Sequence, residues 1–251
     1  MLTVDSFMVS LTSRFNAGVF FTGKLLRFLF FLIFLLTVFT SARTLAGYTS
    51  DQMIFFYFSF SLLDTVTQLF FREVYRFRPL IVSGDFDFAL VKPMNPLLRV
   101  LVGGADPLDL GMLPLYIAAV VITGGRLGDV QGMNIASYVL LLANGFIIAT
   151  GFHILVLALG ILATEVDHAI MIFRDVVSMG RIPTDIYHEP LRMITTFVIP
   201  VGVMMTFPAK SLMGLLSPWM IATSLLLGGL FFVLCLKAWQ YALSQYSSAS
   251  S

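Results

Sequence analysis

The chain has 251 residues, of which 58% are hydrophobic and only 12% are charged, with a formal net charge of +1. A water-soluble domain of this length needs far more polar surface, so the composition excludes a soluble domain and indicates an integral membrane protein. A helix that crosses a bilayer core of roughly 30 Å needs about 20 apolar residues.

Six apolar runs of suitable length predict six transmembrane helices. The runs are long and continuously apolar, without the alternation of barrel strands, so we expect an all-α fold. The whole chain, residues 1–251, is expected to form one transmembrane domain. The predicted spans cover residues 25–46, 52–71, 108–124, 136–163, 191–209 and 218–241.

An amphipathic helix is predicted before the first span. Phe7, Leu11, Phe15 and Val19 recur every four residues, with polar residues between them. This spacing is typical of a helix that lies at the inner membrane interface. The first span lacks a small-residue cleavage site and is too long for a signal peptide, so it is expected to be retained.

The fifth run is short and contains Pro200 and Gly202 in its middle. Proline removes a backbone donor and interrupts a helix, and irregular backbone at membrane depth occurs where protein covers it. We therefore expect a broken or re-entrant segment near the fifth span, where Pro208 and Gly214 offer further breaks.

The basic residues set the orientation, because Lys and Arg near span ends favour the cytoplasmic side. With the N-terminus inside, the outer side holds only Arg43, Arg126 and Lys210. The other twelve of the 15 basic residues then face the cytoplasm: Arg14, Lys24, Arg27, Arg72, Arg76, Arg78, Lys92, Arg99, Arg174, Arg181, Arg192 and Lys237. Both termini are thus predicted to be cytoplasmic.

Two long segments, residues 72–107 and 164–190, are predicted on the cytoplasmic side. In the first, Gly84 and Asp85 indicate a turn or a helix start, while Pro93 and Pro96 fix the exit direction. Apolar side chains that could enter a partner's groove are Leu80, Ile81, Phe86, Phe88 and Leu90. The segment suits docking to a soluble partner or anchoring to lipid headgroups, and these residues alone do not separate the two.

The segments 83–87 and 90–97 resemble the loop between the second and third spans of ABC-2 type permeases, in the branch described generically as ABC-2 family transporter protein. A second block strengthens the resemblance and comprises residues 180–187, 198–201 and 207–209. The similarity extends from the first span to the sixth. It rests on the order and spacing of motifs that are individually loose.

The resemblance implies the permease subunit of an ATP-driven ABC transporter, most simply an exporter in a bacterial cytoplasmic membrane. Two permeases, identical or sister chains, would join two ATPase subunits that carry the ATP and Mg²⁺. No nucleic-acid partner is expected. The loop would be a cytoplasmic coupling helix seated in the ATPase, with Arg78, Gly84, Asp85, Phe86, Asp87, Leu90, Lys92, Pro93, Asn95 and Pro96 as its contact residues.

The chain itself is not expected to be an enzyme. The run from Gly18 to Leu25 matches most of a phosphate-binding loop, but Leu25 stands where a Mg²⁺-binding Ser or Thr is required and no strand precedes it. No metal site is predicted, because no metal-ligand spacing recurs. The alternative to an ABC permease is an ATP-independent carrier or a membrane scaffold.

Ionisable residues inside spans are costly and often functional. Asp64 and His153 lie at depths where they could meet, so they are hypothesised to pair or to line a substrate route together with Gln68. The alternative is separate hydrogen bonding to nearby side chains or backbone. Small and polar residues on the fourth and sixth spans favour close helix packing over a substrate groove: Asn144, Gly145, Ala149, Gly151, Ser224 and Gly228.

Overall fold

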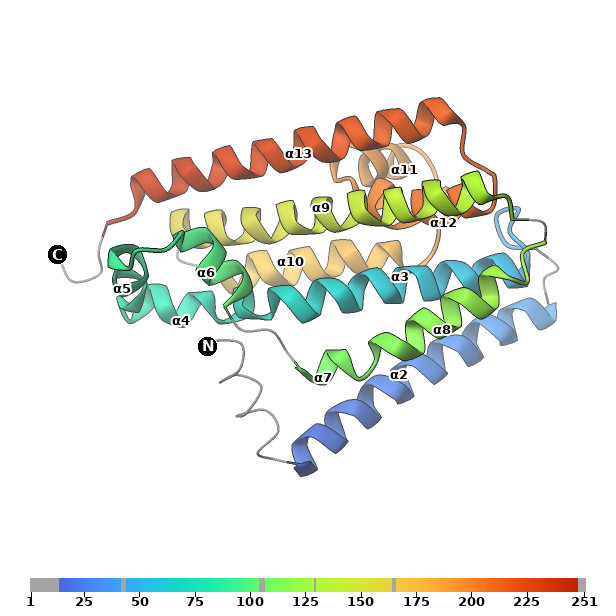
Figure 1. Cartoon of the computed structure of the whole chain (residues 1–251), viewed down its shortest axis with the longest axis horizontal. Coiled ribbons are helices and arrows are strands. Elements are labelled where there is room, and N and C mark those ends of the chain that lie inside the picture. Colours follow the sequence, from blue (N-terminus) through green and yellow to red (C-terminus); the bar gives the residue numbers. More distant parts are fainter. Residues whose placement is uncertain (1–13, 42–43, 104–106, 129, 164–165, 248–251) are drawn as a thin grey trace.

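The computed structural model describes residues 14–41, 44–103, 107–128, 130–163 and 166–247. Over these ranges the chain is helical, and its one strand-like feature is an isolated bridge between Leu45 and Tyr48. The long helices of residues 50–71, 132–162 and 218–245 lie roughly along one axis, and the helix of residues 14–41 is inclined to them (Figure 1). The all-α prediction is confirmed for the described residues.

Helix α2 spans Arg14–Ser41 without a break and therefore ends earlier than the predicted first span. Val19 lies inside it, so the predicted interfacial helix is not a separate element from Arg14 onward; Phe7 and Leu11 lie outside the described residues. The run Gly18 to Leu25 is also part of this helix rather than a loop after a strand.

Helix α3 spans Ser50–Phe71, close to the predicted second span. A capping box starts it: the Thr49 N–H donates to Gln52 Oε1 at 2.9 Å, and the Gln52 N–H donates to Thr49 Oγ1 at 3.4 Å. The 3₁₀ turn η1 (Arg72–Arg76) and helix α4 (Phe77–Val82) continue from it. Residues 50–82 thus form one long helical rod.

The segment between the second and third spans folds into short helices. After α4, a turn at Gly84 leads into α5 (Asp85–Val91), and α6 (Pro96–Val102) follows. These helices lie at the end of the molecule near the C-terminus (Figure 1), which we name the α5 end. The predicted helix start at Gly84 and Asp85 is confirmed.

The predicted third span is shorter than a membrane-spanning helix. It divides into α7 (Pro107–Leu110) and α8 (Leu113–Gly124). Buried Asp109 of α7 forms an ion pair with Lys24 of α2, which ties the two helices together.

Helices α9 (Gly132–Leu162) and α13 (Pro218–Gln245) match the fourth and sixth predicted spans; α9 starts four residues earlier than predicted, and α13 ends four residues later. At 1.5 Å per residue the 31 residues of α9 reach about 46 Å, longer than a bilayer core. Helices α9 and α3 start at the same end of the bundle (Figure 1), and further along them Ser59 Oγ and Tyr138 Oη are 3.1 Å apart. We name this end of the bundle the Tyr48 end, because Tyr48 lies two residues before the start of α3.

Residues 164–190 were predicted to form a segment on the cytoplasmic side, and in the structure the described part, residues 166–190, extends along the bundle instead of forming a loop at one end. Helix α10 (Val166–Ser178) contacts α4 and lies alongside α9 (Figure 1), and the turns η2 (Met179–Arg181) and η3 (Thr184–Ile186) continue beyond it. Asp185 then bonds Tyr48 and Lys210. This segment therefore runs along the bundle to the Tyr48 end, and Arg192, which pairs with Asp185, lies there too.

The predicted fifth span is a bent pair of helical pieces rather than a straight helix. Helix α11 (Leu191–Met193) continues into the π-helical η4 (Ile194–Val198), and the π-helical η5 (Gly202–Thr206) continues into α12 (Phe207–Leu212). The two pieces meet at 76°. The break falls at Pro200, as predicted, because proline cannot donate a helical hydrogen bond.

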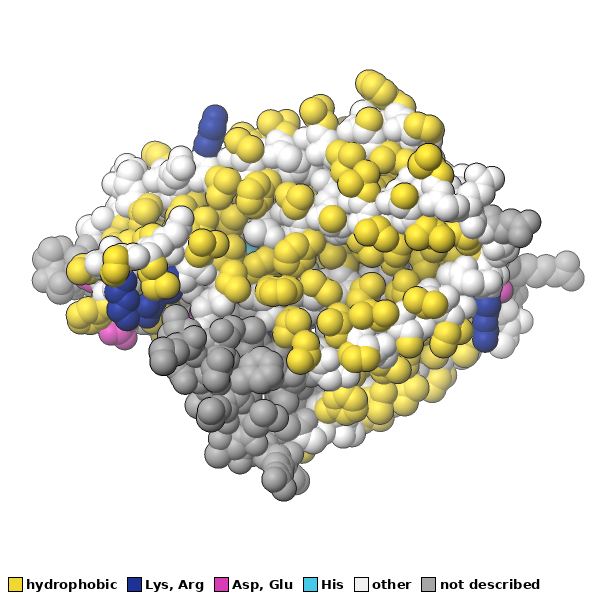
Figure 2. Space-filling model, in the orientation of Figure 1, with side chains coloured by type: hydrophobic (Ala, Val, Ile, Leu, Met, Phe, Trp, Pro, Cys, Tyr) yellow, Lys and Arg dark blue, Asp and Glu magenta, His cyan; other side chains and the backbone are white. Residues whose placement is uncertain are grey.

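Four described helices are long and apolar enough to cross a membrane, or five if the bent pair is one span. Six separate spans of the predicted lengths are therefore not present in the described residues. Hydrophobic side chains cover the middle of the visible face, and charged ones lie mainly toward the ends (Figure 2).

The contact between α9 and α13 depends on small residues, as predicted. Asn144 donates to the Ser224 carbonyl at 3.0 Å, and a Cβ on Gly228 would approach Asn144 Oδ1 to 2.1 Å. Gly151 similarly faces Phe231, with a Cβ distance of 3.0 Å. Without a hydrophobic driving force between helices in lipid, such close approach supplies the packing energy.

Replacing Gly228 by alanine should lower the midpoint of thermal unfolding in detergent, because the added methyl group collides with Asn144. Overpacking of this kind costs about 1–3 kcal/mol. Gly229→Ala is the matched control, since nothing lies within 4 Å of a Cβ at that position. Equal midpoints for the two variants would contradict this account of the α9–α13 contact.

Candidate functional site

The segment around α5 is shaped by two local signals. Gly84 has φ of 77°, the left-handed region that glycine adopts easily, and this lets the chain turn from α4 into α5. Ser83 Oγ donates to Asp85 Oδ2 at 2.7 Å across the turn. At the other side, Asn95 Oδ1 accepts from the Leu97 N–H at 2.9 Å, and Pro96 occupies the first turn of α6.

One face of α5 is packed into the bundle through Phe86. This side chain is completely buried and lies edge-to-face against Phe77 and Tyr246, with ring centroids 5.3 and 5.2 Å away. Trp239 of α13 completes the pocket at 6.4 Å. Tyr246 Oη also donates to Asp87 Oδ1 at 3.0 Å. The short helix is therefore fixed to both α4 and α13.

The opposite face of α5 is exposed. Phe88 is 68% exposed and Val91 is 84% exposed, although both are apolar. Asp85 and Lys92, also exposed, flank them. Large apolar side chains with a polar rim are typical of a protein contact surface. We name Asp85, Phe88, Val91 and Lys92 the α5 tip.

The structure thus divides the residues predicted to contact a partner. Five of them are exposed, namely Arg78, Asp85, Lys92, Pro93 and Asn95, and two are partly buried, Leu90 and Pro96. Asp87 accepts a hydrogen bond from Tyr246, and Gly84 forms the turn. Phe86 is buried inside this chain and cannot contact a partner, so that expectation is wrong. Residues three apart share a helix face, and this spacing would have separated Phe88 and Val91 from Phe86.

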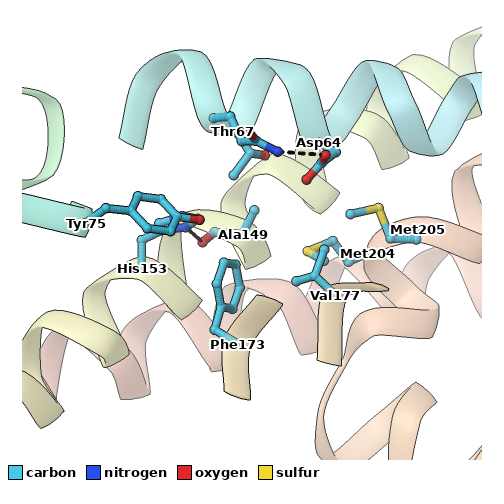
Figure 3. Close-up of a pocket in the computed structure, with 10 residues that line it drawn as sticks. Asp64, Thr67, Tyr75, Ala149, His153, Phe173, Val177, Met204 and Met205 are labelled. Atoms are coloured by element: carbon cyan, nitrogen blue, oxygen red, sulfur yellow. Dashed lines mark hydrogen bonds between the residues drawn. The ribbon is translucent and has the colours of Figure 1, made fainter. Parts of the chain in front are cut away.

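A second candidate site is a small cavity in the middle of the bundle (Figure 3). Its walls come from α3, η1, α9, α10 and the bent pair, and its volume of about 10 Å³ has room for about one water molecule. The residues that line it are Asp64, Thr67, Gln68, Tyr75, Ala149, His153, Phe173, Val177, Met204 and Met205.

Asp64, Gln68 and His153 meet around this cavity, but Asp64 and His153 do not hydrogen-bond directly. Gln68 Nε2 donates to Asp64 Oδ2 at 2.8 Å. His153 Nδ1 lies 2.7 Å from the Ala149 carbonyl oxygen, and its Nε2 has no hydrogen-bond partner among the described residues. Each side chain therefore has a local partner, as the alternative interpretation predicted, while both border one space. Tyr75 and Phe173 also line the cavity, and no sequence pattern predicted them as site residues.

A third polar cluster lies at the Tyr48 end around Asp185. Tyr48 Oη donates to Asp185 Oδ2 at 2.6 Å, Lys210 Nζ donates to the same oxygen at 3.0 Å, and Arg192 Nη2 donates to Oδ1 at 3.0 Å. Burial by itself raises the pKa of the Asp185 carboxyl, but these three donors lower it below its ordinary value. Burial and the bond to Asp185 raise the pKa of Tyr48. The cluster joins three segments that are distant in the sequence: the residue Tyr48, the stretch from Asp185 to Arg192, and Lys210 of α12.

The sequence profile of the family described as ABC-2 family transporter protein matches residues 25–250. The chain belongs to this family. No curated protein and no solved structure matches it significantly.

Membership makes the chain a membrane permease component of an ABC transporter, which is not itself catalytic. Such components associate with an ABC ATPase. The match covers α5, the cavity and the Asp185 cluster, because all three lie between residues 25 and 250. The family and the apolar helices together give a membrane location.

Replacing Phe86 by alanine should lower the free energy of unfolding by about 3–5 kcal/mol, because a fully buried aromatic side chain is removed. Phe88→Ala, in the same helix, should change it by no more than about 0.5 kcal/mol, because this ring is exposed. Denaturant unfolding in detergent, followed by tryptophan fluorescence of Trp239, measures both. A reversed order of the two effects would show that α5 docks by its other face.

The Asp185 cluster predicts an acid-sensitive stability. The pKa of Asp185 is lower in the folded chain than in the unfolded chain, where it is about 3.9. The ionised carboxylate therefore stabilises the folded chain above the unfolded pKa, and this stabilisation is lost as pH falls through the lower folded value. The unfolding midpoint of the wild type should therefore exceed that of Asp185→Asn at pH 7, and this gap should narrow below about pH 4. A gap independent of pH would contradict the ion-pair account.

Proposed function

We propose that this chain is the permease subunit of an ATP-driven exporter, and that a separate ATPase binds the α5 tip. The observation that carries the proposal is the two-sided character of α5. Its buried face is fixed to α4 and α13 through Phe86, while its other face presents Phe88 and Val91 to the solvent. An anchored helix with an exposed apolar face suits a docking site that must transmit force.

A continuous path leads from the α5 tip into the membrane. α5 packs on α4, and residues 50–82 form one helical rod that includes α3. On its other side, Phe86 contacts Trp239 near the end of α13. Movement of the α5 tip on ATP binding would therefore displace α3 and α13 together. In our proposal this displacement alternates access to a substrate route at the permease interface.

The orientation follows from the charges. Arg72, Arg76, Arg78, Lys92 and Arg99 belong to the segment that forms the α5 end. Lys and Arg favour the cytoplasmic side, so in our proposal this end and the C-terminus lie on the cytoplasmic side of a bacterial inner membrane. ATP is available on that side, which is consistent with an ATPase at α5.

The apolar outer surface supports a second permease copy or a sister permease. In the membrane-spanning windows, only 11% of α2 and 17% of α13 are buried inside the chain. Lipid and a second permease can share this surface. Two permeases would present two α5 tips, one for each of two ATPase subunits.

The docking proposal is tested with Phe88→Asp. A charged side chain at the centre of the contact should reduce co-purification of an ABC ATPase from the native membrane at least about tenfold, equivalent to 1.4 kcal/mol of binding free energy. ATP hydrolysis by the purified complex should fall in parallel.

Met133→Asp is the matched control, because Met133 is 74% exposed and begins α9 at the opposite end. It introduces the same charge and should leave the complex intact. Unchanged ATPase recovery with Phe88→Asp would reject docking at the α5 tip. Absence of an ATPase from the wild-type preparation, together with substrate movement by the purified chain, would favour an ATP-independent carrier.

A further inference from the structure

The cavity beside Asp64 contains an unusual histidine. His153 is 1% exposed and is surrounded by the rings of Phe71, Phe173 and Tyr75, at centroid distances of 4.8, 4.7 and 6.4 Å. It lies at the cavity wall beside Tyr75 (Figure 3). Its aromatic neighbours leave few polar groups within reach.

The hydrogen bond to Ala149 fixes the tautomer of the ring. A carbonyl oxygen only accepts, so Nδ1 must carry the hydrogen and donate it across the 2.7 Å distance. The other nitrogen, Nε2, is then an acceptor with its lone pair in the plane of the ring. It is buried and has no hydrogen-bond donor among the described residues. A buried acceptor in such a position calls for a donor that is not part of the chain.

The cavity selects the size and chemistry of that donor. Its volume of about 10 Å³ has room for about one water molecule. Asp64, Tyr75 and His153 all line it, so a molecule there lies among side chains that carry polar groups. Ordered water in proteins typically makes two to four hydrogen bonds, so this polar lining favours water over an empty space.

We propose that this cavity binds one water molecule that bridges His153 Nε2 to the Asp64 carboxyl. The water donates one hydrogen to Nε2. When Asp64 is ionised, the water donates its second hydrogen to the carboxylate; when Asp64 is protonated, the carboxyl donates to the water oxygen instead. The bridge therefore forms in either state, and the existing bond from Gln68 to Asp64 Oδ2 is retained.

The bridge joins α3 to α9, close to the end of α3 that leads toward α5. Asp64 is 7 residues before the end of α3 at Phe71, and Tyr75 of η1 lines the same cavity. Residues 50–82 lead from here to α5, whereas His153 belongs to α9. The water thus forms a polar contact between the rod that ends at α5 and the central helix of the bundle.

Solid-state NMR of ¹⁵N-histidine-labelled protein in lipid vesicles tests the proposal. The chain has 3 histidines, so replacing His168 and His188 by glutamine leaves His153 as the single labelled ring. We expect a protonated Nδ1, an unprotonated Nε2 shifted by hydrogen bonding, and transfer of water magnetisation to Nε2. Asp64→Leu should abolish this transfer, because it removes the polar partner and fills the cavity.

Two further variants serve as controls. Asp64→Asn keeps the size and polarity of the side chain and should retain the water signal, while Asp51→Leu, at the exposed start of the same helix, should leave the spectrum unchanged. An Nε2 without water contact in the wild-type background would overturn the proposal, even if Asp64→Leu does not fold. A water signal that persists in a folded Asp64→Leu variant would overturn it as well.

Discussion

The rest of the structure depends on close packing against α9. This helix contacts α3, α10, α12 and α13. In a membrane the hydrophobic effect does not drive helices together, because lipid tails are as apolar as the side chains. Close packing at small residues stabilises the contacts instead: the Met204 carbonyl packs against Gly145, and Asn144 packs against Gly228. Because these contacts lie along one helix, a displacement of α3 or α13 would change the packing against α9. This property suits a permease that has discrete conformations.

The α5 segment shows how a short helix can be both anchored and available. A seven-residue helix has little stability of its own. The buried ring of Phe86, held between Phe77, Trp239 and Tyr246, supplies the missing packing. The helix that carries the exposed ring of Phe88 is then already ordered, which in our proposal lowers the cost of binding a partner. In our proposal, anchoring and partner binding thus use opposite faces of one helix.

Polar groups inside the bundle follow one rule, which is that each needs a partner because lipid supplies none. Asn144 finds the Ser224 carbonyl and Gln68 finds Asp64. At the Tyr48 end, Asp185 accepts from three donors and fixes the bent pair against the loop before α3. These bonds place irregular backbone near Pro200 where protein covers it.

The sequence by itself determined the membrane class, the helices α3, α9 and α13, the turn at Gly84 and the break at Pro200, because hydropathy and backbone restrictions act locally. It did not reveal that α10 runs along the bundle, because this helix has only 13 residues and carries Arg174 and Asp175, so its hydropathy does not indicate a membrane-embedded helix. Only the tertiary structure decided that Phe86 points inward, that Asp64 and His153 share a cavity, and that Asp185 meets Tyr48. Each of these depends on which surface another helix covers, and no local pattern encodes that.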